Sequence, residues 1–128
     1  MKRICLLLSF LCLTAIGVMA QDPVKVEPKH YSVEFENAQV RVLRIKYGPH
    51  EKSVMHWHPA GVVILLSDMN TRFTLANGKT EERSGKTGDT MPTLAEKHLP
   101  ENLSDQPFAA ILVELKAKPV KSRRSRKP

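Results

Sequence analysis

The sequence predicts an all-β domain, a small barrel or sandwich of antiparallel strands. Short apolar segments alternate with Gly- and Pro-containing turns, and after residue 20 no stretch keeps a helical period. Asn77-Gly78 lies between segments 71–76 and 79–83, where Phe73 and Leu75 share the face expected to turn inward. A two-residue type I′ turn needs positive φ at both positions, so this pair is the strongest hairpin signal in the chain.

The remaining strands are predicted from the same signals, apolar periodicity and turn residues. In residues 40–47, Val40 and Val42 share one face, whereas the apolar pattern continues from Leu43 on the other, and this slip predicts a bulge. Five consecutive apolar residues at 62–66 suit a strand covered on both faces. The other expected strands are 53–58, 94–99 (interrupted by Pro100) and 108–115, with turns at Gly48-Pro49, Pro59-Ala60-Gly61, Gly85 and Gly88-Asp89.

The first twenty residues resemble a secretory signal peptide. Lys2 and Arg3 precede an apolar run, and Val18-Met19-Ala20 ends in small or modest residues, which predicts cleavage after Ala20 and a periplasmic or secreted protein. A retained membrane anchor is the alternative, but a spanning helix needs about 20 apolar residues. Both cysteines lie in this segment, so the mature chain has no disulfide and no thiolate.

The net charge of +7 belongs to the ends of the chain. Residues 116–127 hold seven Lys or Arg and no acid, while residues 21–115 hold eleven basic against thirteen acidic residues. The basic segment has no aromatic residue, which argues against nucleic acid as a partner. We expect an extended arm over 21–32, a single barrel domain over 33–115, and a disordered tail over 116–128 that is either a solubilising end or a weak contact to anionic surfaces.

Three histidines predict a metal site. His56 and His58 are two residues apart, so they project from the same face of a strand, and His98 can join them from a facing strand. Three imidazoles suit a divalent Fe, Mn, Zn, Ni or Cu ion. The alternative is three buried histidines satisfied by hydrogen bonds. His50 belongs to a loop, and His30 in the arm carries no signal.

At these residues the chain resembles the cupin superfamily. His56-Trp57-His58 matches the His-x-His of the first family motif, while Gly88-Asp89 and the pair His98 and Asn102 match parts of the second. The resemblance covers residues 33–115 and implies a jelly-roll β-barrel with the metal site inside it. Trp57 should point away from its two neighbours and pack in the barrel wall.

The chain departs from the cupin pattern at the acidic ligand. The family glutamate should stand at position 62 or 63, and both positions are valine. Glu51 and Glu101 are candidate replacements, although neither lies at the family position. Some cupins use three histidines, so the resemblance still implies a metal site.

The function expected from these features is an exported small cupin that binds a metal ion, a small ligand, or both. A metal-dependent oxidoreductase of the dioxygenase type, or an isomerase, is the first alternative. A barrel with an inert cavity, tethered to envelope surfaces by the tail, is the second. The pattern names no catalytic residue and no organic cofactor, and the resemblance leaves a homodimer open because cupins often pair.

The signal-peptide hypothesis makes a direct prediction. Protein exported by its native host should begin at Gln21, because the basic start, the apolar run and the small residues together direct cleavage after Ala20. Intact mass and N-terminal sequencing measure this, and a protein that keeps residues 1–20 would restore the membrane-anchor alternative.

Overall fold

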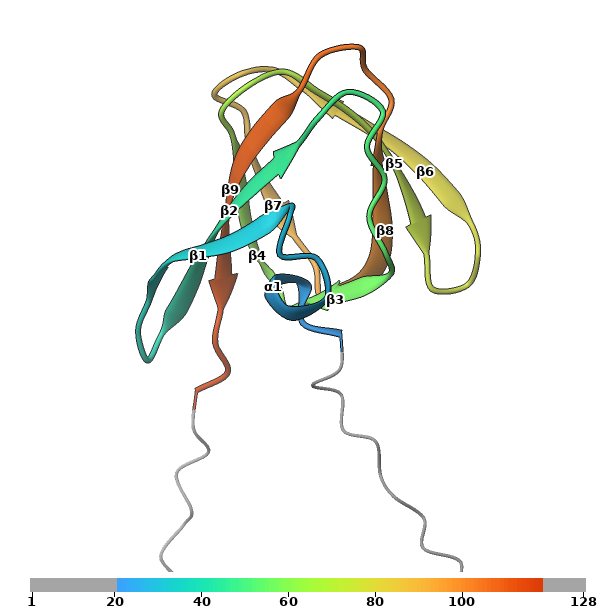
Figure 1. The fold of residues 1–128 in the computed structure, drawn as a ribbon. Coiled ribbons are helices and arrows are strands. Elements are labelled where there is room, and N and C mark those ends of the chain that lie inside the picture. The colour runs from blue at the N-terminus through green and yellow to red at the C-terminus, as the bar shows by residue number, and fades with distance from the viewer. Residues whose placement is uncertain (1–20, 119–128) are drawn as a thin grey trace, which may run out of the picture.

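A computed structural model describes residues 21–118 and contains two antiparallel sheets. The five-stranded sheet has the order β1-β2-β9-β4-β7, and the four-stranded sheet has the order β3-β8-β5-β6 (Figure 1). The strands are β1 (Tyr31–Glu36), β2 (Val40–Tyr47), β3 (His56–His58), β4 (Gly61–Leu65), β5 (Met69–Leu75), β6 (Thr80–Gly85), β7 (Thr90–Thr93), β8 (Glu96–Asn102) and β9 (Phe108–Leu115). The all-β prediction is confirmed.

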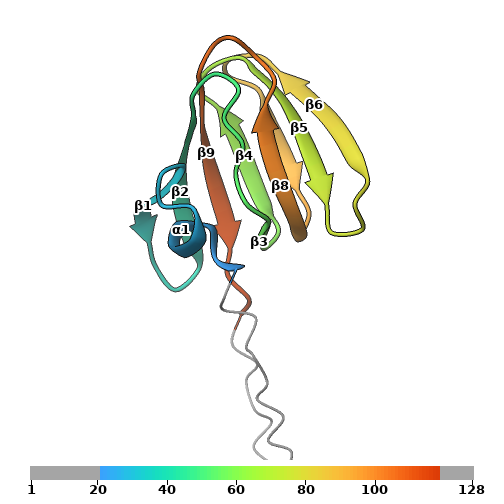
Figure 2. The ribbon, with the colours of Figure 1, turned by 45° about the vertical axis from the view of Figure 1, so that its right-hand side comes forward.

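The core lies between the two sheets. Inward side chains of the larger sheet supply most of it, and Met69 of β5 faces them from the smaller sheet. Figure 1 shows the two sheets as opposite walls of one barrel, and in Figure 2 most strands run roughly alongside one another. The buried apolar residues are Tyr31, Leu43, Ile45, Tyr47, Leu65, Met69, Phe108, Ala110 and Leu112.

Strands β2 and β9 form the longest strand pair among the described residues. Their register runs without a shift from Val40 opposite Leu115 to Tyr47 opposite Phe108. The bulge predicted in β2 is therefore wrong, and the irregularity lies in β1, between Val33 and Phe35. The apparent slip arose because Arg41, a charged residue, occupies an inward position in an otherwise regular alternation.

The predicted hairpin joins β5 and β6, but its turn differs from the expected type. Leu75 and Lys79 close the loop through the Leu75 N–H donating to the Lys79 carbonyl. Gly78 has a φ of 83°, whereas Asn77 does not lie in the positive-φ region, so the loop has three residues and ends in a left-handed glycine. The Asn77 side chain instead accepts from the Lys79 N–H at 3.0 Å.

The ends of the domain differ from the sequence prediction. The arm is not extended throughout, because Pro23–Val26 form a helical turn, α1, capped by the Asp22 side chain, and β1 already begins at Tyr31. Lys116 is held by backbone and side-chain bonds to Gln39 and Glu36. The predicted signal peptide and the tail from residue 119 onward lie outside the described residues. Within 21–118, no helix has the length and apolar character needed to cross a membrane.

Strands β1 and β7 were not expected. β7 consists of Thr90–Thr93 and carries little apolar signal. The expected strand 94–99 corresponds to β8, which begins at Glu96 and continues through Pro100 to Asn102. Pro100 sits opposite Phe73 of β5, and its carbonyl accepts from the Ser53 N–H. A proline is tolerated at this point because the loop before β3, rather than a full strand, lies on its other side.

Candidate metal centre

Strands β3 and β8 bring the three predicted histidines together. His56 lies opposite His98 in the register of this pair, and His58 follows two residues later on the same face. β8 is thus the hydrogen-bonded neighbour of β3, and the expectation of a facing strand for His98 is wrong. One ring nitrogen from each histidine lies within 4.8 Å of the other two, so three nitrogens surround a common point.

Each imidazole is held by its Nδ1 atom. Nδ1 of His56 lies 2.8 Å from the Val54 carbonyl oxygen, Nδ1 of His58 lies 2.7 Å from a Glu114 carboxylate oxygen, and Nδ1 of His98 lies 2.6 Å from a Glu96 carboxylate oxygen. A carbonyl or carboxylate oxygen can only accept, which assigns the proton of each neutral ring to Nδ1. The Nε2 lone pairs are therefore free to bind a metal ion.

The Nε2 atom of His56 is a buried polar atom without a hydrogen-bond partner among residues 21–118. Such an atom is costly in a folded protein, by about 1–3 kcal/mol, unless something satisfies it. A divalent cation at the shared centre of the three rings would do so. The cluster therefore fits a metal ion better than the alternative of three histidines satisfied by hydrogen bonds alone.

Burial keeps two of the three rings neutral. Desolvation, reinforced by the neighbouring His58 and His98 rings, lowers the pKa of His56 to about 3. Desolvation also lowers the pKa of His98 to about 4, although its hydrogen bond to Glu96 opposes the shift. A metal ligand must be deprotonated, so both rings are ready for a cation at neutral pH.

Each carboxylate behind the cluster is paired with an arginine. Burial alone would raise the pKa of Glu114, but hydrogen bonds from His58 and from Arg41, whose Nε lies 2.6 Å away, lower it. Glu96 likewise accepts two bonds from Arg83, at 3.0 and 2.9 Å, and its pKa is lowered despite desolvation. Both carboxylates therefore stay ionised and hold their histidines in a fixed orientation.

Glu96 and Glu114, the carboxylate partners of the histidines, were not predicted from the sequence. Glu114 follows Phe108, Ala110 and Leu112 at every second position of an apolar strand, so its inward direction could have been deduced. The acids considered as replacements lie elsewhere: Glu51 contacts His30 and Glu101 pairs with Arg72.

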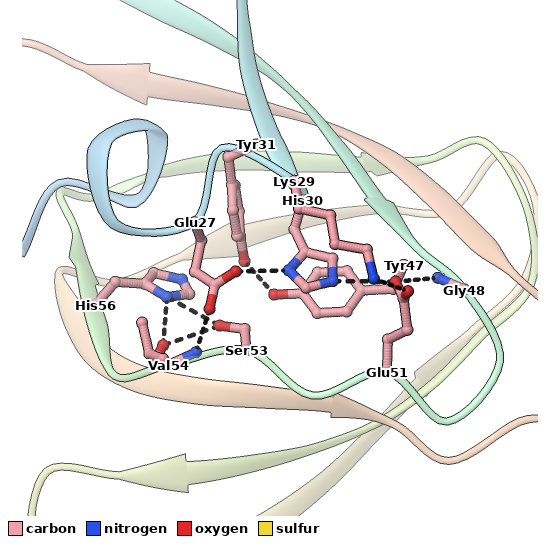
Figure 3. A network of polar contacts seen from close by, with 10 residues as sticks. All are labelled: Glu27, Lys29, His30, Tyr31, Tyr47, Gly48, Glu51, Ser53, Val54 and His56. Carbon is pink, nitrogen blue, oxygen red and sulfur yellow. Dashed lines mark hydrogen bonds and ion pairs between the residues drawn. The ribbon is translucent and has the colours of Figure 1, made fainter.

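A network of polar contacts from the N-terminal arm supports the cluster (Figure 3). His30 stacks on Tyr47, with ring centroids 4.1 Å apart, and its two nitrogens lie 2.9 and 3.0 Å from carboxylate oxygens of Glu27 and Glu51. Glu27 also accepts from the Val54 N–H at 2.7 Å. The Val54 carbonyl holds His56, so His30, which carried no signal in the sequence, belongs to the structure that supports the cluster.

Beside the histidines lies a partly open cavity of about 310 Å³. His58 and His98 form part of its wall, together with Tyr31, Phe73 and other residues from both sheets. Val63 also lines it, whereas Val62 does not, so of the two candidate positions for the missing acid only 63 faces the cavity. Trp57 points to the outer surface, 40% exposed, as expected from its place between the two histidines.

The lowered pKa values predict how the metal-free protein responds to acid. Unfolded histidines bind protons near their ordinary pKa of 6.5, whereas His56 and His98 stay neutral in the folded state until about pH 4. The unfolded state thus binds more protons, and the free energy of unfolding should fall as pH drops from 7 to 5. Urea unfolding measures it, and His98→Asn should flatten the slope; an unchanged slope contradicts the assigned protonation.

The comparisons with known proteins concern the fold. No protein-family model matches the chain, and no curated protein matches it. A cupin domain from Bordetella pertussis Tohama I aligns with a TM-score of 0.63 and 21% identity, over 68% of this chain and 92% of that one.

Two further solved structures agree with this alignment. A protein from Klebsiella pneumoniae with a double-stranded β-helix domain gives a TM-score of 0.52 at 21% identity, over 69% and 84% of the two chains. An RmlC-like cupin from Methanocaldococcus jannaschii gives 0.53 at 19% identity, over 68% and 81%. With its two antiparallel sheets and its histidine cluster between them, the chain has the double-stranded β-helix fold of the cupins.

Proposed function

We propose that this protein binds a divalent transition-metal ion through the Nε2 atoms of His56, His58 and His98, and a small molecule in the adjoining cavity. The unpartnered Nε2 of His56, among three rings whose Nδ1 atoms are already held, is the observation that carries the proposal. Three imidazoles suit Zn, Fe, Mn, Ni or Cu. Three protein ligands leave further positions of such an ion to a bound molecule.

A metal-dependent enzyme is the second candidate, favoured by the position of the cavity against two of the histidines. A bound ion would supply Lewis-acid or redox chemistry there. The chain's own part is to keep the imidazoles neutral and oriented and to surround the reactants with apolar side chains. Elemental analysis of protein from its native compartment narrows the alternatives: iron, manganese or copper supports an oxidoreductase, whereas zinc supports binding or an isomerase and leaves an activity assay to separate these two.

Export and the role of the tail remain part of the proposal on sequence grounds. Residues 1–20 have the organisation of a signal peptide, and residues 116–127 hold seven basic residues. A protein that acts outside the cytoplasm could use this tail as a weak electrostatic contact to anionic envelope surfaces. Such a contact between exposed charges is screened over about 10 Å at 0.1 M salt, so envelope binding should weaken as salt rises.

The metal proposal predicts a difference between two histidine variants. His98→Ala removes one of three ligands, so bound metal should fall well below one ion per chain after dialysis. His50→Asn should retain the wild-type content, because His50 is an exposed loop residue with a φ of 56°, a conformation that asparagine tolerates. Mass spectrometry of the metal content measures both; equal content in the two variants rejects the assignment.

The absence of a carboxylate at the position of the family glutamate predicts a second difference between two variants. Val63→Glu places a carboxylate in the cavity wall beside a neutral three-histidine shell, so Zn(II) should raise the melting temperature of this variant more than that of wild type. Val62→Glu is the matched control, because position 62 does not line the cavity. Without metal, Val63→Glu should be the less stable variant, since its carboxylate is buried unpaired. Identical responses in both variants would place the metal elsewhere.

A further inference from the structure

We infer that the cavity beside the three histidines takes a small hydrophobic organic anion, with its charged group toward the histidines and its apolar body among the side chains of both sheets. The inference rests on the proposed metal site and names the class of molecule that shares it. Three properties of the cavity walls carry it: their apolar character, their balance of charge, and their few free hydrogen-bonding groups.

The body of the cavity is apolar. Phe73 lies beside His98, with ring centroids 4.9 Å apart, and Phe108, Met69, Met91 and Leu112 continue the wall. The volume of about 310 Å³ lies at the lower end of the range of ligand pockets. A compact aromatic or branched aliphatic body fits such a space.

The charge of a bound dication would find no compensation in the first shell. An imidazole must be neutral to bind a metal, so the three ligands would bring no charge, and position 63, which faces the cavity, is a valine. Glu96 is already paired with Arg83, and Glu114 with Arg41. In a low-dielectric cavity the remaining positive charge strongly favours a ligand that brings a carboxylate or enolate oxygen.

The walls do not suit a phosphate or a sugar. Arg83 is the one Lys or Arg among the lining residues, and it is occupied by Glu96 and by Glu81, 2.9 Å away. The hydroxyl groups of Tyr31 and Tyr47 bond to each other at 3.0 Å. Two buried hydroxyls lack a partner among residues 21–118, those of Thr71 and Thr93, and only Thr93 lines the cavity, which leaves room for a single polar substituent on the ligand.

The test uses Co(II)-loaded protein and three probes of graded chemistry: benzoate, acetate and glucose 6-phosphate. The visible absorption of bound cobalt reports a ligand at the metal, and calorimetry gives its affinity. Burying a phenyl-sized body contributes about 1.5–3 kcal/mol, so benzoate should bind about tenfold to a hundredfold more tightly than acetate. Glucose 6-phosphate should bind more weakly than benzoate.

Two alanines on β9 provide matched variants. Ala110 lines the cavity, so Ala110→Leu fills part of it and should lower benzoate affinity at least tenfold while leaving acetate unchanged. Ala109 points to the other face of the same strand, so Ala109→Leu should bind both probes as wild type does. The cobalt spectrum before any probe is added shows whether each variant keeps its metal centre.

The outcomes distinguish this inference from the metal proposal. A protein that takes up no cobalt overturns both. A cobalt-loaded protein that binds benzoate no better than acetate, or glucose 6-phosphate better than benzoate, overturns the ligand class and leaves the metal site standing. Because the comparison of probes is made on wild-type protein, it decides the question even if Ala110→Leu fails to fold.

Discussion

The fixed orientation of three imidazoles is the constraint on which the rest of this structure depends. Each Nδ1 atom is bound to an acceptor from a different segment: the loop before β3, strand β8 and strand β9. Two of these acceptors are carboxylates, and a carboxylate is expensive to bury unless it is paired. Arg41 and Arg83 provide the pairing, from inward or partly buried positions that a barrel wall would otherwise give to apolar residues.

The sequence was most informative where periodicity and turn chemistry act locally. Residues 40–47 and 108–115 form strands with the predicted bounds, and the hairpin at Asn77-Gly78 lies where it was expected. Strand β7 was not predicted because Thr90–Thr93 is short and hardly apolar and forms only through pairing with β4. The bulge was misplaced because an inward-facing, partly buried arginine looks like a break in the pattern until its partner Glu114 is known.

The same contrast between local features and long-range contacts applies to the candidate site. The His-x-His spacing and the later His98 identify the cluster, because same-face geometry is a local property of a strand. The partners of the rings depend on pairings between distant segments, and so does the burial of His30, which stacks on Tyr47 and lies between two carboxylates. None of these contacts leaves a repeat or a motif in one sequence. Glu114 is the exception, since the alternation of its own strand turns it inward.

The negative charge near this cluster lies on carboxylates that bond to the imidazoles, not on a carboxylate that would itself bind a metal ion. With valine at position 63, the negative charge beside the cluster comes only from Glu96 and Glu114. Both carboxylates bond to imidazoles, and both are paired with arginines. The three rings keep their orientation but would do little to neutralise a bound dication, so a molecule that binds to such an ion would have to bring the compensating charge. The N-terminal arm also helps to orient the rings: Glu27 accepts from the Val54 N–H, while the Val54 carbonyl holds His56. A segment that the sequence placed outside the barrel thus helps to fix the position of His56 inside it, in the way that partners of metal ligands orient those ligands.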